Sequence, residues 1–111
     1  MSAADADLLR QVTDAIVAAA SPERIILFGS QARGEALPGS DIDLVVVEHE
    51  PFGPGRSRRA EAGRIAWACR AIPVPQDVVL CSEAEFARWR HSTNHPVGRA
   101  AREGRVIYER H

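Results

Sequence analysis

The sequence predicts an α/β fold in which a small mixed sheet of about four strands is flanked by helices. Two features of the chain lead to this prediction. Short apolar runs, bounded by turn residues, alternate with segments in which apolar residues recur at helical spacing. The 111 residues suit a single domain over residues 1–111, which is large enough to bury a core without disulfides or a structural metal.

Apolar spacing and turn residues define the predicted elements of the first half. Leu9, Val12 and Ile16 recur at near-helical spacing, which predicts a helix over residues 6–20 that stops at Ser21-Pro22. Short apolar runs that end or begin at Gly, Pro or Ser predict strands on either side of a turn. These elements are a strand over 25–28, a single helical turn over 30–34 and a strand over 41–48.

A further helix is predicted over residues 56–71, with one buried and one solvated face. Its apolar positions i, i+3, i+4 and i+7 are Ala62, Ile65, Ala66 and Cys69. Its solvated face is expected to carry Arg58, Glu61 and Arg64.

The last third of the chain is predicted to hold a strand over 76–81, two short helices and a strand over 105–109. Ser82 and Glu85 have the spacing of a capping box, which begins a helix that runs to residue 90. The next helix begins at Asn94-His95-Pro96, and Gly104 ends it.

Composition and charge exclude several function classes. A net charge of −1 and an aromatic content of 5% argue against general nucleic-acid binding. Apolar stretches such as 25–28 and 44–47 are far shorter than the roughly 20 residues that cross a bilayer. Residues 1–7 carry acids where an export signal needs positive charge, so we expect a cytoplasmic protein without membrane contact. Cys69 and Cys81 lack metal or disulfide spacing and are expected to be reduced and buried.

Two short motifs in residues 25–48 indicate chemistry. Gly29-Ser30, placed where a strand turns into a helical turn, leaves backbone N–H groups free to hold phosphate, although tight Gly-Ser turns are also common. Asp41 and Asp43 project to one side of an extended strand while Ile42 points into the core. Two such carboxylates repel each other unless a cation such as Mg²⁺ or Mn²⁺ lies between them, and the alternative is a solvated strand end.

A third carboxylate occupies the matching position of the next strand. Asp77 begins the predicted strand over 76–81, as Asp41 and Asp43 begin theirs. If the two strands are neighbours, the three acids converge beside Gly29-Ser30. A polar residue at a strand entry is the alternative interpretation of Asp77.

Together these residues resemble a known family. Gly29-Ser30, ten residues and Asp41-x-Asp43 look like the signature of the polymerase-beta-like nucleotidyltransferase superfamily. The fuller strings over 29–34 and 40–44 are similar to its minimal nucleotidyltransferase branch, of the antitoxin type. The resemblance implies the polymerase-beta-like fold and extends through the third strand to the tail at 101–108.

The resemblance also implies site residues and cofactors. Asp41, Asp43 and Asp77 would be both the catalytic residues and the ligands of two Mg²⁺ ions, or of Mn²⁺, with Asp77 helping to deprotonate the attacking hydroxyl. Nucleotide-binding residues would be Gly29, Ser30, Arg33 and Ser40, with ATP as substrate. For Arg33 a second interpretation is that it braces the following loop through carbonyl contacts.

The implied function is Mg²⁺-dependent transfer of AMP from ATP to a hydroxyl. Because the chain is small, the acceptor is expected on a partner, and in the resembling branch that partner is a HEPN-type ribonuclease toxin modified on a tyrosine. A non-catalytic antitoxin that acts by stoichiometric association is one alternative. Another is the catalytic subunit of a two-chain small-molecule nucleotidyltransferase. Under any of these interpretations the protein could form a homo- or hetero-oligomer.

The remaining polar residues give weaker signals. Arg90 and His95 have an R-x4-H spacing like that of the ribonuclease toxins, which we interpret as chance. The histidines are expected on the solvated surface; they are His49, His91, His95 and His111. A solvated helix face, or a docking surface for an acidic partner, is expected of Arg56, Arg58, Arg59, Arg64 and Arg70.

Overall fold

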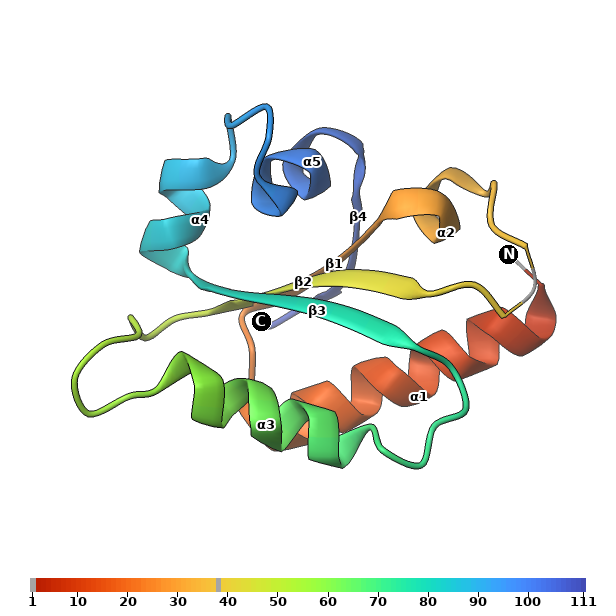
Figure 1. Ribbon diagram of the computed structural model, residues 1–111, viewed down its shortest axis with the longest axis horizontal. Coiled ribbons are helices and arrows are strands. Elements are labelled where there is room, and N and C mark those ends of the chain that lie inside the picture. The colour runs from red at the N-terminus through yellow and green to blue at the C-terminus, as the bar shows by residue number, and fades with distance from the viewer. Residues whose placement is uncertain (1, 38) are drawn as a thin grey trace.

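The computed structural model describes residues 2–37 and 39–111 and has the predicted order of helices and strands. Figure 1 shows the arrangement. The elements are α1 (Ala3–Ala20), β1 (Arg24–Phe28), α2 (Gly29–Arg33), β2 (Ile42–Glu48), α3 (Arg58–Ala68), β3 (Gln76–Ser82), α4 (Glu83–Trp89), α5 (Pro96–Glu103) and β4 (Arg105–Glu109).

The four strands form one mixed sheet in the order β3-β2-β1-β4. Strand β1 runs antiparallel to both β2 and β4, whereas β2 and β3 are parallel. Helices α1 and α3 cover one face of the sheet, and α2, α4 and α5 lie on the other (Figure 1). The α/β fold with a small mixed sheet between helices, predicted from the sequence, is therefore confirmed.

Alternation along the strands divides the core into two layers. Between the sheet and helices α1 and α3 lie residues such as Val12, Ile25, Leu44 and Ile65, whereas Phe28, Val45, Phe86 and Val97 pack between the sheet and helices α4 and α5. The buried Ile42 belongs to the first layer, so its neighbours in the sequence face the second.

Local signals account for most helix ends. The Ser82 hydroxyl accepts from the Glu85 N–H at 3.1 Å while the Glu85 carboxylate accepts from the Ser82 N–H at 2.9 Å, so the predicted capping box is present. Helix α1 begins three residues earlier than predicted, because Ser2 caps it by accepting from the Asp5 N–H. The left-handed Ser21, at φ 51°, ends it as expected.

Helix α3 turns a different face to the sheet from the one predicted. Ala62 and Ala66 are exposed, whereas Glu61, expected in solvent, is only 7% exposed. The helix spans Arg58–Ala68 and so is shorter at both ends than predicted. Its buried face is centred on Ile65, and Glu61 lies one turn before Ile65 on that same face.

A buried charge cluster explains how Glu61 is tolerated there. Arg56 donates to the buried Glu48 carboxylate at 2.5 Å and lies 3.8 Å from Glu61, and Arg64 pairs with Glu61 from solvent. Burial, followed by the neighbouring Glu61 carboxylate, raises the pKa of Glu48 to about 7 despite the opposing effect of Arg56.

The stability of the protein is expected to depend on the protonation of Glu48. A group whose folded-state pKa is raised above its ordinary value binds its proton more tightly when folded, so the free energy of unfolding should fall as pH rises from about 4.5 to about 7. Glu48→Gln should remove this pH-dependent loss of stability, which amounts to roughly 3 kcal/mol at most. Urea unfolding across this pH range measures it, with the exposed Glu50→Gln as control, and a Glu48→Gln variant that keeps the wild-type slope would contradict it.

Two of the arginines expected on a solvated face are structural instead. Arg58 donates to the Leu80 carbonyl at 2.7 Å and pairs with the Glu85 carboxylate of the capping box. The guanidinium groups of Arg56 and Arg58 lie 4.3 and 4.5 Å from the centroid of the Phe52 ring. These contacts join α3 and the preceding loop to β3 and α4.

Both cysteines are buried, as the sequence predicted. Cys69 and Cys81 are free and buried, and burial raises the pKa of Cys81 to about 12, so it stays a thiol. None of the helices within residues 2–37 and 39–111 is long and apolar enough to cross a membrane.

Candidate active site

The junction of β1 and α2 forms the centre of the candidate site. Gly29 has φ +73°, a left-handed conformation that favours glycine, and the chain turns there from strand into helix. A Cβ atom on Gly29 would lie 2.3 Å from Oδ2 of Asp43. The backbone can therefore approach the Asp43 carboxylate only because residue 29 has no side chain.

The sheet register brings two of the three predicted acids side by side. Asp43 is the partner of Phe28 on β1 and of Asp77 on β3. Residues opposite each other in neighbouring strands point to the same face, so both carboxylates lie on the face covered by α2, α4 and α5. Asp43 is half-buried, whereas Asp77 and Asp41, which precedes β2, are exposed.

The electrostatics of Asp43 reflect this crowding. Burial raises the pKa of Asp43 most, followed by the negative charges of Asp77 and Asp41, while Arg99 and Arg33 act in the opposite direction. The acids are therefore close enough to disfavour full ionisation of Asp43. A cation bound between them would relieve that repulsion.

The donor chemistry of this site fits a hard divalent cation, but a ligand shell is not preformed. Carboxylate oxygens are the ligands that Mg²⁺ and Mn²⁺ prefer. Among the residues described, no three acidic, histidine or cysteine side chains are arranged to hold a metal ion together. The predicted roles of Asp41, Asp43 and Asp77 as ligands and catalytic residues stay predictions.

The residues around the turn have distinct structural roles. The Ser30 hydroxyl lies in the first turn of α2 beside Gly29 and is half-buried. Gln31 is buried and donates to the Ser40 carbonyl at 3.2 Å, which ties α2 to the loop that leads to Asp41. Sequence reasoning missed Gln31, because nothing in a lone glutamine shows which carbonyl it will bind.

Arg33 contacts carboxylates instead of the loop carbonyls expected for it. Its Nε lies 3.2 Å from Glu35 and its Nη1 lies 3.1 Å from Glu103 on α5. These two acids raise the pKa of the exposed Arg33 guanidinium. Arg33 thus joins α2 to α5, and its predicted contact with the nucleotide stays a prediction.

Arg99 is a residue near the site that sequence reasoning missed. Its guanidinium carbon lies 5.6 Å from the centroid of the Phe28 ring, and Phe28 is followed directly by Gly29. Because Arg99 is so distant from Gly29 along the chain, no sequence spacing could have indicated this neighbour. Only the packing of α5 over the β1–β2 face brings it here.

His95 is half-buried and makes structural contacts, whereas the sequence predicted a solvated surface residue. Its ring stacks on Trp89 at a centroid distance of 4.3 Å, and its Nδ1 accepts from the Val97 N–H as the cap of α5. Arg90 is the C-cap of α4. The Arg90 and His95 spacing therefore has a structural explanation at the ends of two helices.

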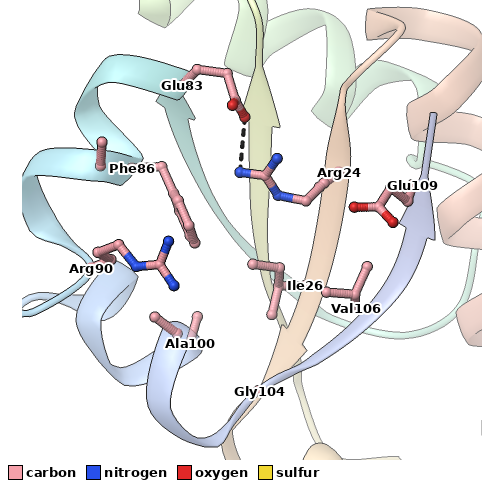
Figure 2. Close-up of a pocket in the computed structure, with 11 residues that line it drawn as sticks. Arg24, Ile26, Glu83, Phe86, Arg90, Ala100, Gly104, Val106 and Glu109 are labelled. Carbon is pink, nitrogen blue, oxygen red and sulfur yellow. Dashed lines mark ion pairs between the residues drawn. The ribbon is translucent and has the colours of Figure 1, made fainter. Parts of the chain in front are cut away.

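A pocket lies at the other end of the same sheet face. Figure 2 shows this cavity of about 450 Å³ between α4, α5, β1 and β4. Its lining includes the ion pair of Arg24 with Glu83, at 2.8 Å, and the apolar side chains of Ile26 and Ala100 (Figure 2). Arg24 and Phe28 stand at opposite ends of β1, about 13 Å apart, so the cavity does not contain the acids.

One family model and three solved structures are similar to this chain. A family model described as a nucleotidyltransferase domain matches residues 9–106. A chain from Sulfolobus solfataricus, described as a nucleotidyltransferase, has a TM-score of 0.59 and 20% identity over 99% of this chain and 90% of that one. A toxin–antitoxin structure with AMP-PNP has a TM-score of 0.53 and 19% identity, covering 91% and 73%.

A third solved structure is described as a minimal nucleotidyltransferase. Its TM-score is 0.56 at 25% identity, covering 90% of this chain and 92% of that chain. No curated protein sequence matches this one. The likenesses at 19 and 20% identity show the fold alone.

Proposed function

This chain belongs to the nucleotidyltransferase domain family, and from that membership we propose that it transfers AMP from ATP to a hydroxyl group on a partner protein. A nucleotidyltransferase domain implies a nucleoside triphosphate substrate and, in general, a divalent metal. The specific acceptor we propose is a tyrosine of a HEPN-type ribonuclease toxin, with this chain as the antitoxin. The observation that carries the proposal is the placement of Asp43 opposite Asp77 and against Gly29.

Each of the site residues predicted from the sequence has a proposed role in the reaction. The N–H groups at Gly29 and the Ser30 hydroxyl would bind the terminal phosphates at the start of α2, with the Ser40 loop held in place by Gln31. Asp77, exposed on the edge strand β3, would accept the proton of the attacking hydroxyl. The hydroxyl oxygen then forms a bond to the α-phosphorus as the bond to the β-phosphate breaks, and pyrophosphate leaves.

A divalent metal fits the donor set of the three acids. Asp41, Asp43 and Asp77 would hold Mg²⁺, which when bound neutralises phosphate charge and aligns the triphosphate for in-line displacement. The raised pKa of Asp43 supports this, because a carboxylate crowded by two others gains most from a bound cation.

One comparison supports a protein as the acceptor, in addition to the small size of the chain. A structural neighbour of this chain is a toxin–antitoxin solved with AMP-PNP. If this chain formed a complex of that kind, a second polypeptide would supply the hydroxyl.

Intact-mass spectrometry of a separated partner tests the proposal. The protein encoded by the adjacent gene is incubated with this chain and Mg·ATP, separated from it and assayed. Covalent silencing predicts a partner that stays inactive and gains whole AMP units, and Ser30→Ala should slow this gain without weakening association, at a cost of roughly 1–3 kcal/mol for the lost phosphate contact. A partner that regains activity at unchanged mass would contradict AMP transfer and favour a stoichiometric binding module.

A further inference from the structure

We propose that Arg99 on α5, and not Arg33 on α2, is the arginine that binds the β- and γ-phosphates of the nucleotide, an inference that rests on the proposed nucleotidyl transfer. The pattern of residues around Gly29 places the nucleotide-binding arginine at position 33. Contacts in the structure favour the arginine of the neighbouring helix.

The location of Arg99 follows from the register of β1. Phe28 and Asp43 are partners across β1 and β2, and both point to the face that α5 covers. The Arg99 guanidinium lies 5.6 Å from the Phe28 ring. Figure 1 shows α5 on the same face of the sheet as α2, and Phe28, whose ring Arg99 approaches, is followed directly by Gly29 at the start of α2.

The two arginines differ in how firmly protein carboxylates hold them. Arg33 is within hydrogen-bonding distance of both Glu35 and Glu103, at 3.2 and 3.1 Å. Arg99 has its nearest carboxylate, again Glu103, at 3.8 Å, beyond hydrogen-bonding distance, and 47% of its side chain is exposed. To bind phosphate, Arg33 would have to exchange two existing contacts, whereas Arg99 would exchange one long one.

The other arginine of α5 has a different role. Arg102 donates to the carbonyls of Ser92 and Thr93 at 2.7 and 3.3 Å and so holds the α4–α5 loop. Glu103 holds Arg33 and lies near Arg99, so it fixes the spacing between α2 and α5. Arg99 is the arginine of this helix that is placed for an anionic ligand at the α2 turn.

Calorimetric titration with Mg·ATP and with AMP tests the inference in the intact chain. Arg99→Ala should weaken Mg·ATP binding by at least about tenfold, which corresponds to ~1.4 kcal/mol, and leave AMP binding within about twofold of wild type. Arg99→Lys should restore part of the loss, because it keeps the charge but not the bidentate geometry. Arg59→Ala, an exposed arginine on α3 across the sheet, should bind both ligands as wild type does.

Two results would overturn the assignment of Arg99, and a third would overturn the proposed function on which it rests. Equal Mg·ATP affinity in Arg99→Ala and wild type would exclude the role, above all if Arg33→Ala lost affinity instead. An equal loss of ATP and AMP binding in Arg99→Ala, with a lowered melting temperature, would show that Arg99 only supports the fold. A wild-type protein that binds no Mg·ATP would contradict the proposed function itself, which distinguishes that failure from a misplaced arginine.

Discussion

The double variant Asp41→Asn/Asp43→Asn is expected to lose AMP transfer by at least about a hundredfold while remaining folded. Asparagine keeps the shape of each side chain but loses the negative charge that the proposed metal ions require. The variant should also lose the Mg²⁺ dependence of ATP binding. Transfer of label from radioactive ATP to the partner measures the first effect, and titration with Mg²⁺ present or chelated measures the second.

Stability provides the internal control for this variant. Because burial and the charges of Asp77 and Asp41 raise the pKa of Asp43, ionisation of Asp43 opposes folding as pH rises past its ordinary range. Replacement by asparagine removes that cost, so the variant should melt at or above the wild-type temperature. Asp14→Asn, an exposed change on α1 across the sheet, should leave transfer and melting unchanged. A double variant that still labels the partner at the wild-type rate would show that these acids are not catalytic.

The elements of the fold were predictable where a local pattern fixes them. The Ser82 and Glu85 capping box, Pro96 at the start of α5 and Gly104 at its end act through neighbours within a few residues. The strands could be predicted because a short apolar run between turn residues, in a chain of this size, is seldom anything other than a buried strand. The parallel pairing of β2 with β3, by contrast, is a property of the folded sheet.

The incorrect predictions concern α3, where a charged side chain is buried because residues distant in the sequence pair with it. Apolar spacing predicted that Ala62 and Ala66 face the core, since burying Glu61 alone would be unfavourable. In the structure Arg56 and Arg64 compensate Glu61, and Glu48 on β2 shares the cluster. No sequence pattern shows that β2 and α3 bring these groups together.

The residues of the candidate site likewise form two groups, those that the sequence indicates and those that only the structure reveals. Gly29, Ser30, Asp41, Asp43 and Asp77 are visible in the sequence because strand alternation and turn chemistry limit where such residues point. Gln31 and Arg99 are not visible, because their contacts depend on a loop closing back and on a helix far along the chain. Polar residues that act through tertiary contacts can be recognised only once the fold is known.

Gly29→Ala is expected to impair both stability and transfer, through two separable effects. At φ +73° an alanine costs about 1–2 kcal/mol of backbone strain. Its Cβ would also lie 2.3 Å from Asp43 Oδ2, so the carboxylate must move away from the turn. Displacement of a catalytic group by about 1 Å can cost about a hundredfold in rate. Chemical unfolding and the partner-labelling assay measure the two losses.

Gly34→Ala is a matched control for the backbone strain that Gly29→Ala introduces. It also has φ +73°, at the other end of α2, but no atom lies within 4 Å of a Cβ placed there. Gly34→Ala should therefore show the same strain and little loss of transfer. In an Asp43→Ala background the clash is absent, so Gly29→Ala should then destabilise the protein only as much as Gly34→Ala does. If both alanine variants lost transfer equally, strain in α2, and not the approach of the backbone to Asp43, would be the reason that residue 29 is glycine.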